Sequence, residues 1–199
     1  MTLRRSIAIA VLFLAAALRI TDLCRFGLNN DEIAEVSWSR LPLRQTLAQA
    51  ARDKVHPPID YLVQHLMTSM AATECARRVP GVMAGVATVA LIMFIGFRIF
   101  GWSAGVIAGL LLSLSPMHIR YSQEIRPYAL GLLAVTVAIS ALLEYQRTQR
   151  RRWDVVWFTS MIAAAYTLYF AAMVAGIASI AIIFLERKNK MRELWRRSP

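Results

Sequence analysis

Two short clusters of polar and charged residues stand beside apolar runs in this sequence. The longer cluster, residues 115–130, contains Arg120, Glu124 and Arg126. The shorter one, Asn-Asn-Asp-Glu at 29–32, follows the first apolar run. Charged groups at the edge of a membrane interior are costly and mark functional sites. If both clusters face the same side of a bilayer, they can form one site.

The acidic pair Asp31 and Glu32 has two interpretations. One is a helix N-cap, with Asn30 or Asp31 capping a helix that begins near Glu32, because acids are favoured in a first turn. The other is a carboxylate held just outside the membrane, near a reacting hydroxyl, as a general base. The residue types alone leave both open.

The arginines of the longer cluster suit an anion. An exposed salt bridge between Glu124 and Arg120 or Arg126 would contribute little stability. A guanidinium also matches the oxygens of a phosphate, so these arginines can hold a lipid phosphate while Glu124 takes a metal or orders a ligand. His56 is either a surface or capping histidine or a ligand. Asp, Glu and His from separate loops can together bind a divalent metal.

The composition indicates a membrane protein. The chain has 199 residues, of which 57% are hydrophobic, and a net charge of +11; its mean hydropathy is +0.48. Such a chain is too apolar for an ordinary soluble domain. Many Lys and Arg residues stand in short blocks between apolar runs, which is typical of cytoplasmic loops and argues against a nucleic-acid surface. Cys24 and Cys75 form either a disulfide or two buried thiols.

The pattern predicts an all-α, polytopic bundle of about six transmembrane helices. Apolar runs occupy about 6–20, 79–95, 104–114 and 128–143, and the first is an uncleaved helix rather than a signal peptide. The run at 155–185 would form a helix of about 46 Å, beyond a membrane core of about 30 Å. We therefore expect two helices that meet near residues 166–170.

The basic blocks set the orientation. With six spans, the blocks at 4–5, 98, 147–152 and 187–192 fall on one side, which is cytoplasmic by the positive-inside rule. Both termini are then cytoplasmic in a plasma (inner) membrane protein, with a basic tail at about 186–199. The outer loops are about 21–78 and 116–127, so both polar clusters lie outside. Arg25, Arg77 and Arg78 are exceptions to the rule.

The long first outer loop is expected to contain amphipathic surface helices. Apolar residues recur at helical spacing over 58–73, whereas Asp60, Gln64 and Thr68 occupy the other face. A short seventh span is the alternative. A second amphipathic helix is predicted over 31–52, broken at Pro42. Residues 1–199 thus form a single transmembrane module.

Several strings in this order resemble one family. They are Asn-Asp-Glu at 30–32, His-Pro-Pro at 56–58, Gly-x-Arg-x-Phe-Gly at 96–101 and Tyr-Ser-Gln-Glu-x-Arg-x-Tyr-Ala at 121–129. The sequence resembles the GT-C membrane glycosyltransferases, especially the branch with protein O-mannosyltransferases and lipid A aminoarabinose transferases. The resemblance extends over residues 4–185.

The resemblance implies transfer of a sugar, with inversion, from a polyprenyl phosphate to an acceptor protein, lipid or glycan on the outer face. Asp31 would be the catalytic base, supported by Glu32. The donor phosphate and substrate would be bound by the following residues: Arg126, Arg120, Gln123, Tyr128 and His56. Glu124, with His56, would hold a divalent metal ion, the one cofactor implied.

Two departures from the family qualify this expectation. Relatives often have histidine where this chain has Leu168, in the turn between the fifth and sixth spans. Family members are also longer, so we expect a fragment, a truncated product or one half of an assembly with a further membrane chain. The rival hypothesis is a non-catalytic protein of the same fold that binds lipid phosphate or completes a partner. A small transporter would need polar residues at mid-membrane, which are few here.

Overall fold

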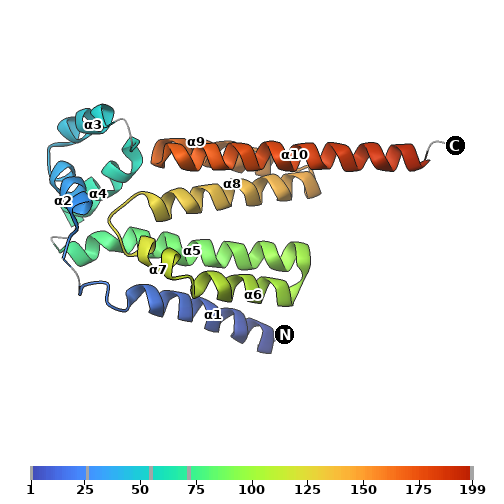
Figure 1. Cartoon of the computed structure of the whole chain (residues 1–199), viewed down its shortest axis with the longest axis horizontal. Helices are drawn as coiled ribbons and strands as arrows, with labels where there is room; N and C mark the ends of the chain where they lie inside the picture. Colours follow the sequence, from blue (N-terminus) through green and yellow to red (C-terminus); the bar gives the residue numbers. More distant parts are fainter. Residues whose placement is uncertain (1, 26, 54–55, 71–72, 198–199) are drawn as a thin grey trace.

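The computed structural model describes residues 2–25, 27–53, 56–70 and 73–197, with side chains described from Leu3 to Glu186. Over these ranges its regular structure is α-helical, as predicted. The longer helices run along the long axis of the molecule (Figure 1): α1 (Thr2–Ile20), α5 (Glu74–Phe100), α6 (Trp102–Ser113), α8 (Tyr128–Thr148), α9 (Arg151–Thr167) and α10 (Tyr169–Arg197). The start of α1 and the end of α10 point toward the same end of the bundle (Figure 1).

Three described helices are each long and apolar enough to cross a membrane, namely α5, α8 and the Tyr169–Glu186 part of α10. A fourth crossing is possible if α6 and the short α7 (Pro116–Ser122), bent by 64° at their junction, form one broken span. Two other long helices are not in this set: α1 carries three arginines, and α9 has only 17 residues. These lengths and compositions are those of a membrane protein, and the count of six spans stays a prediction.

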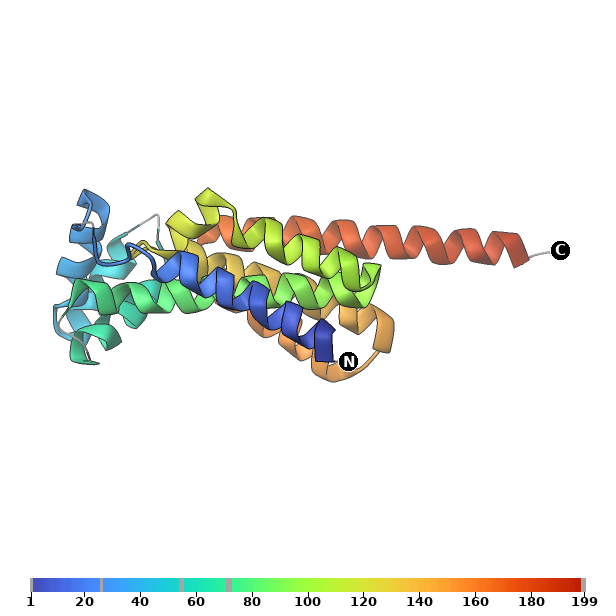
Figure 2. The same ribbon diagram turned by 90° about the horizontal axis from the view of Figure 1, so that it is seen from below.

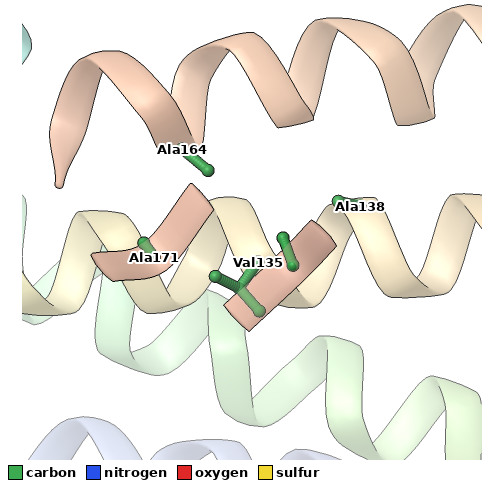
Figure 3. Packing of buried hydrophobic residues seen from close by; sticks show 5 residues of the cluster. Val135, Ala138, Ala164 and Ala171 are labelled. Carbon is green, nitrogen blue, oxygen red and sulfur yellow. The ribbon is translucent and has the colours of Figure 1, made fainter. Parts of the chain in front are cut away.

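The apolar run at 155–185 is divided into two helices, as predicted. Leu168 separates α9 from α10 in an extended conformation, with φ −157° and ψ 119°. The two helices pack against α8 through small side chains, which permit close approach of the helices (Figure 3). The buried cluster consists of Val135, Ala138, Ala164, Ala171 and Ala175.

The short helix α7 occupies part of the second predicted outer loop. Ser115 caps it by accepting a hydrogen bond from the backbone N–H of His118, and Pro116 suits its first position. The segment between α6 and α8 is therefore helical in part.

An apolar cluster joins the first helix to the bundle. Val11 and Ala15 of α1 pack with Val89 and Met93 of α5.

Three helices fill the segment between α1 and α5: α2 (Asn30–Ser39), α3 (Leu43–Arg52) and α4 (Pro58–Met70). They gather at one end of the bundle in both views (Figures 1 and 2). The expected break at Pro42 is present. A disulfide between Cys24 and Cys75, with Cα atoms 5.1 Å apart, joins the two ends of this segment.

The helix α4 turns its polar face toward the protein. Asp60, Tyr61 and Gln64 are buried, whereas Leu66 and Met70 are 57% and 72% exposed. An apolar stripe that points away from the protein suits a helix that lies against lipid. The polar side chains of α4 therefore point into the protein, where they can contact α2 and α5.

Arg77 and Arg78, which break the positive-inside pattern, are buried rather than free in a loop. Arg77 donates to the hydroxyls of Ser39 and Thr68, at 3.1 and 2.6 Å. Arg78 pairs with Glu32 at 3.3 Å. The hydrogen bonds and the ion pair of these two arginines therefore connect α5 to α2 and α4.

Candidate functional site

The first turn of α2 determines how Asp31 is presented. Asn29 is the N-cap, instead of the expected Asn30 or Asp31: its side chain accepts from the N–H of Glu32 at 2.9 Å. Glu32 in turn accepts from the N–H of Asn29 at 3.0 Å, which completes a capping box. The cap falls at Asn29 because Glu32 then stands at the third helical position. Asp31 is left with a 73% exposed side chain.

The buried carboxylate of Glu32 connects the two polar clusters. Its Oε1 accepts from the backbone N–H of Ile125 at 2.8 Å, and its Oε2 pairs with Arg78. The Glu32 side chain is only 2% exposed. The start of α2 is thereby attached to the segment between α7 and α8, and clusters about 90 residues apart in sequence meet.

Arg126 lies where the clusters meet. Its Nη2 is 3.9 Å from Oδ2 of Asp31 and 3.0 Å from Nε2 of His56. Its guanidinium lies 5.6 Å from the ring centroid of Tyr128, and its side chain is 10% exposed. Burial alone would lower the pKa of Arg126, but Tyr128, Asp31 and Glu35 raise it above the ordinary value. The group is therefore a permanent cation.

Behind His56 lie two side chains that the sequence did not single out for the site. Oδ2 of Asp53 is 3.1 Å from Nδ1 of His56 and accepts a hydrogen bond from the hydroxyl of Tyr61 at 2.6 Å. The only signal for Asp53 was its position three residues before His56. Tyr61 lies three residues after Pro58, the end of the His-Pro-Pro string, and no role was predicted for it.

Glu35 and Asp60 form a second, deeper acidic pair near Arg126. Each is about 1% exposed, and Oε1 of Glu35 and both carboxylate oxygens of Asp60 have no hydrogen-bond partner. Burial, and then repulsion by Asp60, raises the pKa of Glu35 to about 9. Burial raises the pKa of Asp60 to about 7, although Arg126 opposes the shift. Neither residue was predicted from the sequence.

The other predicted site residues belong to a separate group. Arg120 pairs with Glu124 at 3.1 Å, with the Arg120 side chain 78% exposed. Gln123 donates to the carbonyl oxygens of Arg19 and Thr21, at 3.1 and 2.8 Å. These three residues, with Glu32 and Arg78 among others, line a polar cavity of about 330 Å³.

The residues expected to hold a metal do not share a group of contacts. His56 contacts Asp53 and Arg126, whereas Glu124 contacts Arg120. Among the described side chains, no three His, Cys, Asp or Glu residues converge as metal ligands. A role for a divalent metal stays a prediction from the resemblance, and the mechanism below does not depend on it.

A second cavity, of about 280 Å³, is mainly apolar and has Tyr128 in its wall. Its walls include Leu112, Met117, Tyr121, Tyr128 and Leu132. The rings of Tyr121 and Tyr128 are 4.9 Å apart. Tyr128 contacts Arg126 as well, so this side chain connects the cation to the apolar cavity. This combination suits a ligand with a phosphate and a hydrocarbon chain.

Comparison with known proteins gives one match. The family described as dolichyl-phosphate-mannose-protein mannosyltransferase matches residues 55–197. These residues include Arg126, Tyr128 and the other residues of the longer polar cluster. No curated protein and no solved structure matches the chain.

Proposed function

The chain belongs to the dolichyl-phosphate-mannose-protein mannosyltransferase family, and from this premise we propose that it is a glycosyltransferase that uses a polyprenyl-phosphate sugar. The acceptor is a hydroxyl group on a protein, lipid or glycan at the outer face of the membrane. The observation that carries the proposal is that Arg126 contacts both Asp31 and Tyr128, and that Tyr128 lines the apolar cavity.

In the proposed donor complex, the apolar cavity takes the first isoprenoid units and Arg126 binds the phosphate. The cavity is lined mainly by apolar and aromatic side chains, which suit a hydrocarbon chain. The guanidinium of Arg126 is held by His56 on one side and by the ring of Tyr128 on another. A cation fixed in this way binds phosphate at a lower cost in side-chain entropy than a free one.

In the proposed reaction, Asp31 accepts the proton of the acceptor hydroxyl. The acceptor oxygen forms a bond to the anomeric carbon of the sugar while the bond from that carbon to the phosphate oxygen breaks, with inversion. The electron pair of the broken bond stays on the phosphate, where Arg126 stabilises the added negative charge. The exposure of Asp31 leaves room for an acceptor, and the contacts of Glu32 keep the first turn of α2 against the donor site.

The arrangement of the helices supports an outer-face site. The start of α2 and the segment between α7 and α8, which carry Asp31 and Arg126, lie toward the end of the bundle that holds α3 and α4, and α1 begins at the other end (Figure 1). The outward apolar face of α4 would rest in the outer lipid surface. We propose six membrane crossings in an inner membrane, with the basic blocks at the cytoplasmic end.

Binding of the donor tests this proposal. The purified chain is incubated with polyprenyl-phosphate mannose and examined by native mass spectrometry, wild type beside Arg126→Ala. Loss of the buried cation should weaken donor binding by about tenfold or more, since hydrogen bonds to charged groups contribute about 1.5–3 kcal/mol. Arg44→Ala is the matched control, because it removes an exposed arginine of α3 that has no proposed role in the site. Equal binding by the wild type and Arg126→Ala would contradict the proposed phosphate site.

A further inference from the structure

Four side chains form a continuous line of contacts into the proposed donor site. The hydroxyl of Tyr61 donates to Oδ2 of Asp53, which lies 3.1 Å from Nδ1 of His56. Nε2 of His56 lies 3.0 Å from Nη2 of Arg126. The side chains of Asp53 and His56 are only 14% and 13% exposed, so water competes little for these contacts.

The chemistry of the partners fixes where the protons are. A guanidinium has only donors, so Nε2 of His56 must be the acceptor of the bond from Arg126. The ring proton of neutral His56 must then be on Nδ1, where it is donated to Asp53. Tyr61 stays a donor to the same oxygen, because burial and then the bond to Asp53 raise the pKa of Tyr61 well above its ordinary range. The bonds from Arg126 to His56, from His56 to Asp53 and from Tyr61 to Asp53 can all form only in this tautomer.

We propose that Asp53 is a positioning residue of the donor site: it fixes His56 in the Nδ1–H tautomer, and His56 in turn holds the Arg126 guanidinium beside Asp31. Without Asp53, the Nδ1–H of His56 loses its acceptor and only the bond from Arg126 still favours this tautomer, so the ring presents an Nε2–H more often. That N–H would face the N–H of Arg126, and the bond between them would be lost. The proposal rests on the proposed function, because it takes Arg126 as the group that binds the donor phosphate.

Other charged groups around Arg126 do not replace this contact. Asp31 lies 3.9 Å away and is largely exposed, so it holds the guanidinium loosely. Glu35 and Asp60 act on Arg126 through charge, and no hydrogen bond joins either of them to it in the described structure. His56 is therefore the neighbour that accepts a hydrogen bond from Nη2, and Asp53 stabilises the tautomer of His56 that this bond requires.

Two substitutions of Asp53 separate its acceptor role from its bulk. Asp53→Ala removes the acceptor for both His56 and Tyr61. Asp53→Asn keeps an oxygen where Oδ2 now accepts both bonds, so it should preserve the tautomer although it removes the negative charge. Asp154→Ala is the control for loss of an acidic side chain, since Asp154 is exposed on the first turn of α9.

The first readout is the tautomer of His56 by ¹⁵N NMR on histidine-labelled protein. His56→Gln identifies its signals among the three histidines of the chain. We expect proton-bearing Nδ1 in the wild type and in Asp53→Asn, and a shift toward Nε2–H in Asp53→Ala. An Nε2–H tautomer in the wild type would overturn the proposal. A residue with a merely structural role would leave this signal unchanged.

The second readout is binding of polyprenyl-phosphate mannose. We expect Asp53→Ala to bind at least about tenfold more weakly than the wild type, because Arg126 loses the partner that orients it. Asp53→Asn and Asp154→Ala should bind like the wild type. Binding by Asp53→Ala equal to that of the wild type would also overturn the proposal. Absence of donor binding by the wild type would instead refute the proposed function, and the tautomer of His56 would still decide the contact with Asp53.

Discussion

Replacing Glu32 by Gln is expected to destabilise the attachment of α2 to the segment between α7 and α8. The carboxylate of Glu32 accepts from the backbone N–H of Ile125, from the N–H of Asn29 and from Arg78. A glutamine side chain has one oxygen and one NH₂ group, so it can accept at only one of the two positions. Its NH₂ group would face either Ile125 or Arg78, both of which are donors.

The size of the effect follows from the burial of both charges. The side chains of Glu32 and Arg78 are 2% and 6% exposed. Removing one partner of a buried ion pair costs about 3–5 kcal/mol, because the other charge stays buried without compensation. Arg78 keeps its bonds to the carbonyl oxygens of Leu23 and Gly27, so we expect the lower part of this range.

Glu124→Gln is the matched control. It makes the same chemical change in the pair with Arg120, whose side chain is 78% exposed, and should cost at most about 1 kcal/mol. The free energy of unfolding is measured for both variants in the same detergent, by thermal or denaturant titration. If Glu32→Gln costs no more than Glu124→Gln, the buried pair does not hold this end of the molecule together as argued.

Two further predictions concern stability. Because the pKa of Glu35 is raised from 4.5 to about 9, the folded chain binds more protons than the unfolded chain between these values, so stability should fall as pH rises through this window. Glu35→Gln should reduce this fall in thermal unfolding measured from pH 5 to pH 9, and an unchanged slope would contradict the burial of this acid. The Cys24–Cys75 disulfide, with a sequence separation of 51, should contribute about 4 kcal/mol by restricting the unfolded chain. Thermal unfolding of the Cys24→Ser, Cys75→Ser double variant measures this contribution, and the same midpoint as the oxidised wild type would argue against it.

The helical architecture could be predicted from the sequence because the signals are local. Long apolar runs predict the helices, and the excessive length of the run at 155–185 predicts the break, which falls at Leu168. Pro42 predicts the division between α2 and α3. The short helix α7 was missed because a polar cluster with prolines at 116 and 127 resembles a loop, although Ser115 and Pro116 are a helix-start signal.

The arrangement of the site could be predicted only in part. The sequence indicated that residues 29–32 and 115–130 share one side of the membrane, and the contact between Glu32 and Ile125 brings these clusters together. The division of the candidate residues between Arg126 and the polar cavity depends on side-chain directions that no spacing reveals. The same holds for Arg77 and Arg78, whose burial is set by α2 and α4.

The acidic residues near Arg126 show this limit most clearly. Asp60 has the spacing of a solvent-facing residue on an amphipathic helix, but the polar face of α4 is turned inward. Glu35 lies one turn beyond Asp31 on α2, and only the packing of α2 against α4 makes it a buried acid. Asp53 acquires a role only through His56 and Tyr61.

Transfer of the sugar by wild type and Asp31→Asn is the most direct test of the proposed reaction. The chain is placed in lipid nanodiscs with polyprenyl-phosphate [¹⁴C]mannose, a mixture of hydroxyl-bearing peptides, lipids and glycans is added, and label in the acceptors is counted. We predict transfer by the wild type and its loss in Asp31→Asn, with donor binding and thermal stability retained, because the exposed Asp31 side chain makes a single long ion pair, at 3.9 Å, within the part of the chain that the structure describes. Equal transfer by both proteins would contradict the role of Asp31 as the base, and donor binding without transfer by the wild type would identify a non-catalytic lipid-phosphate binder.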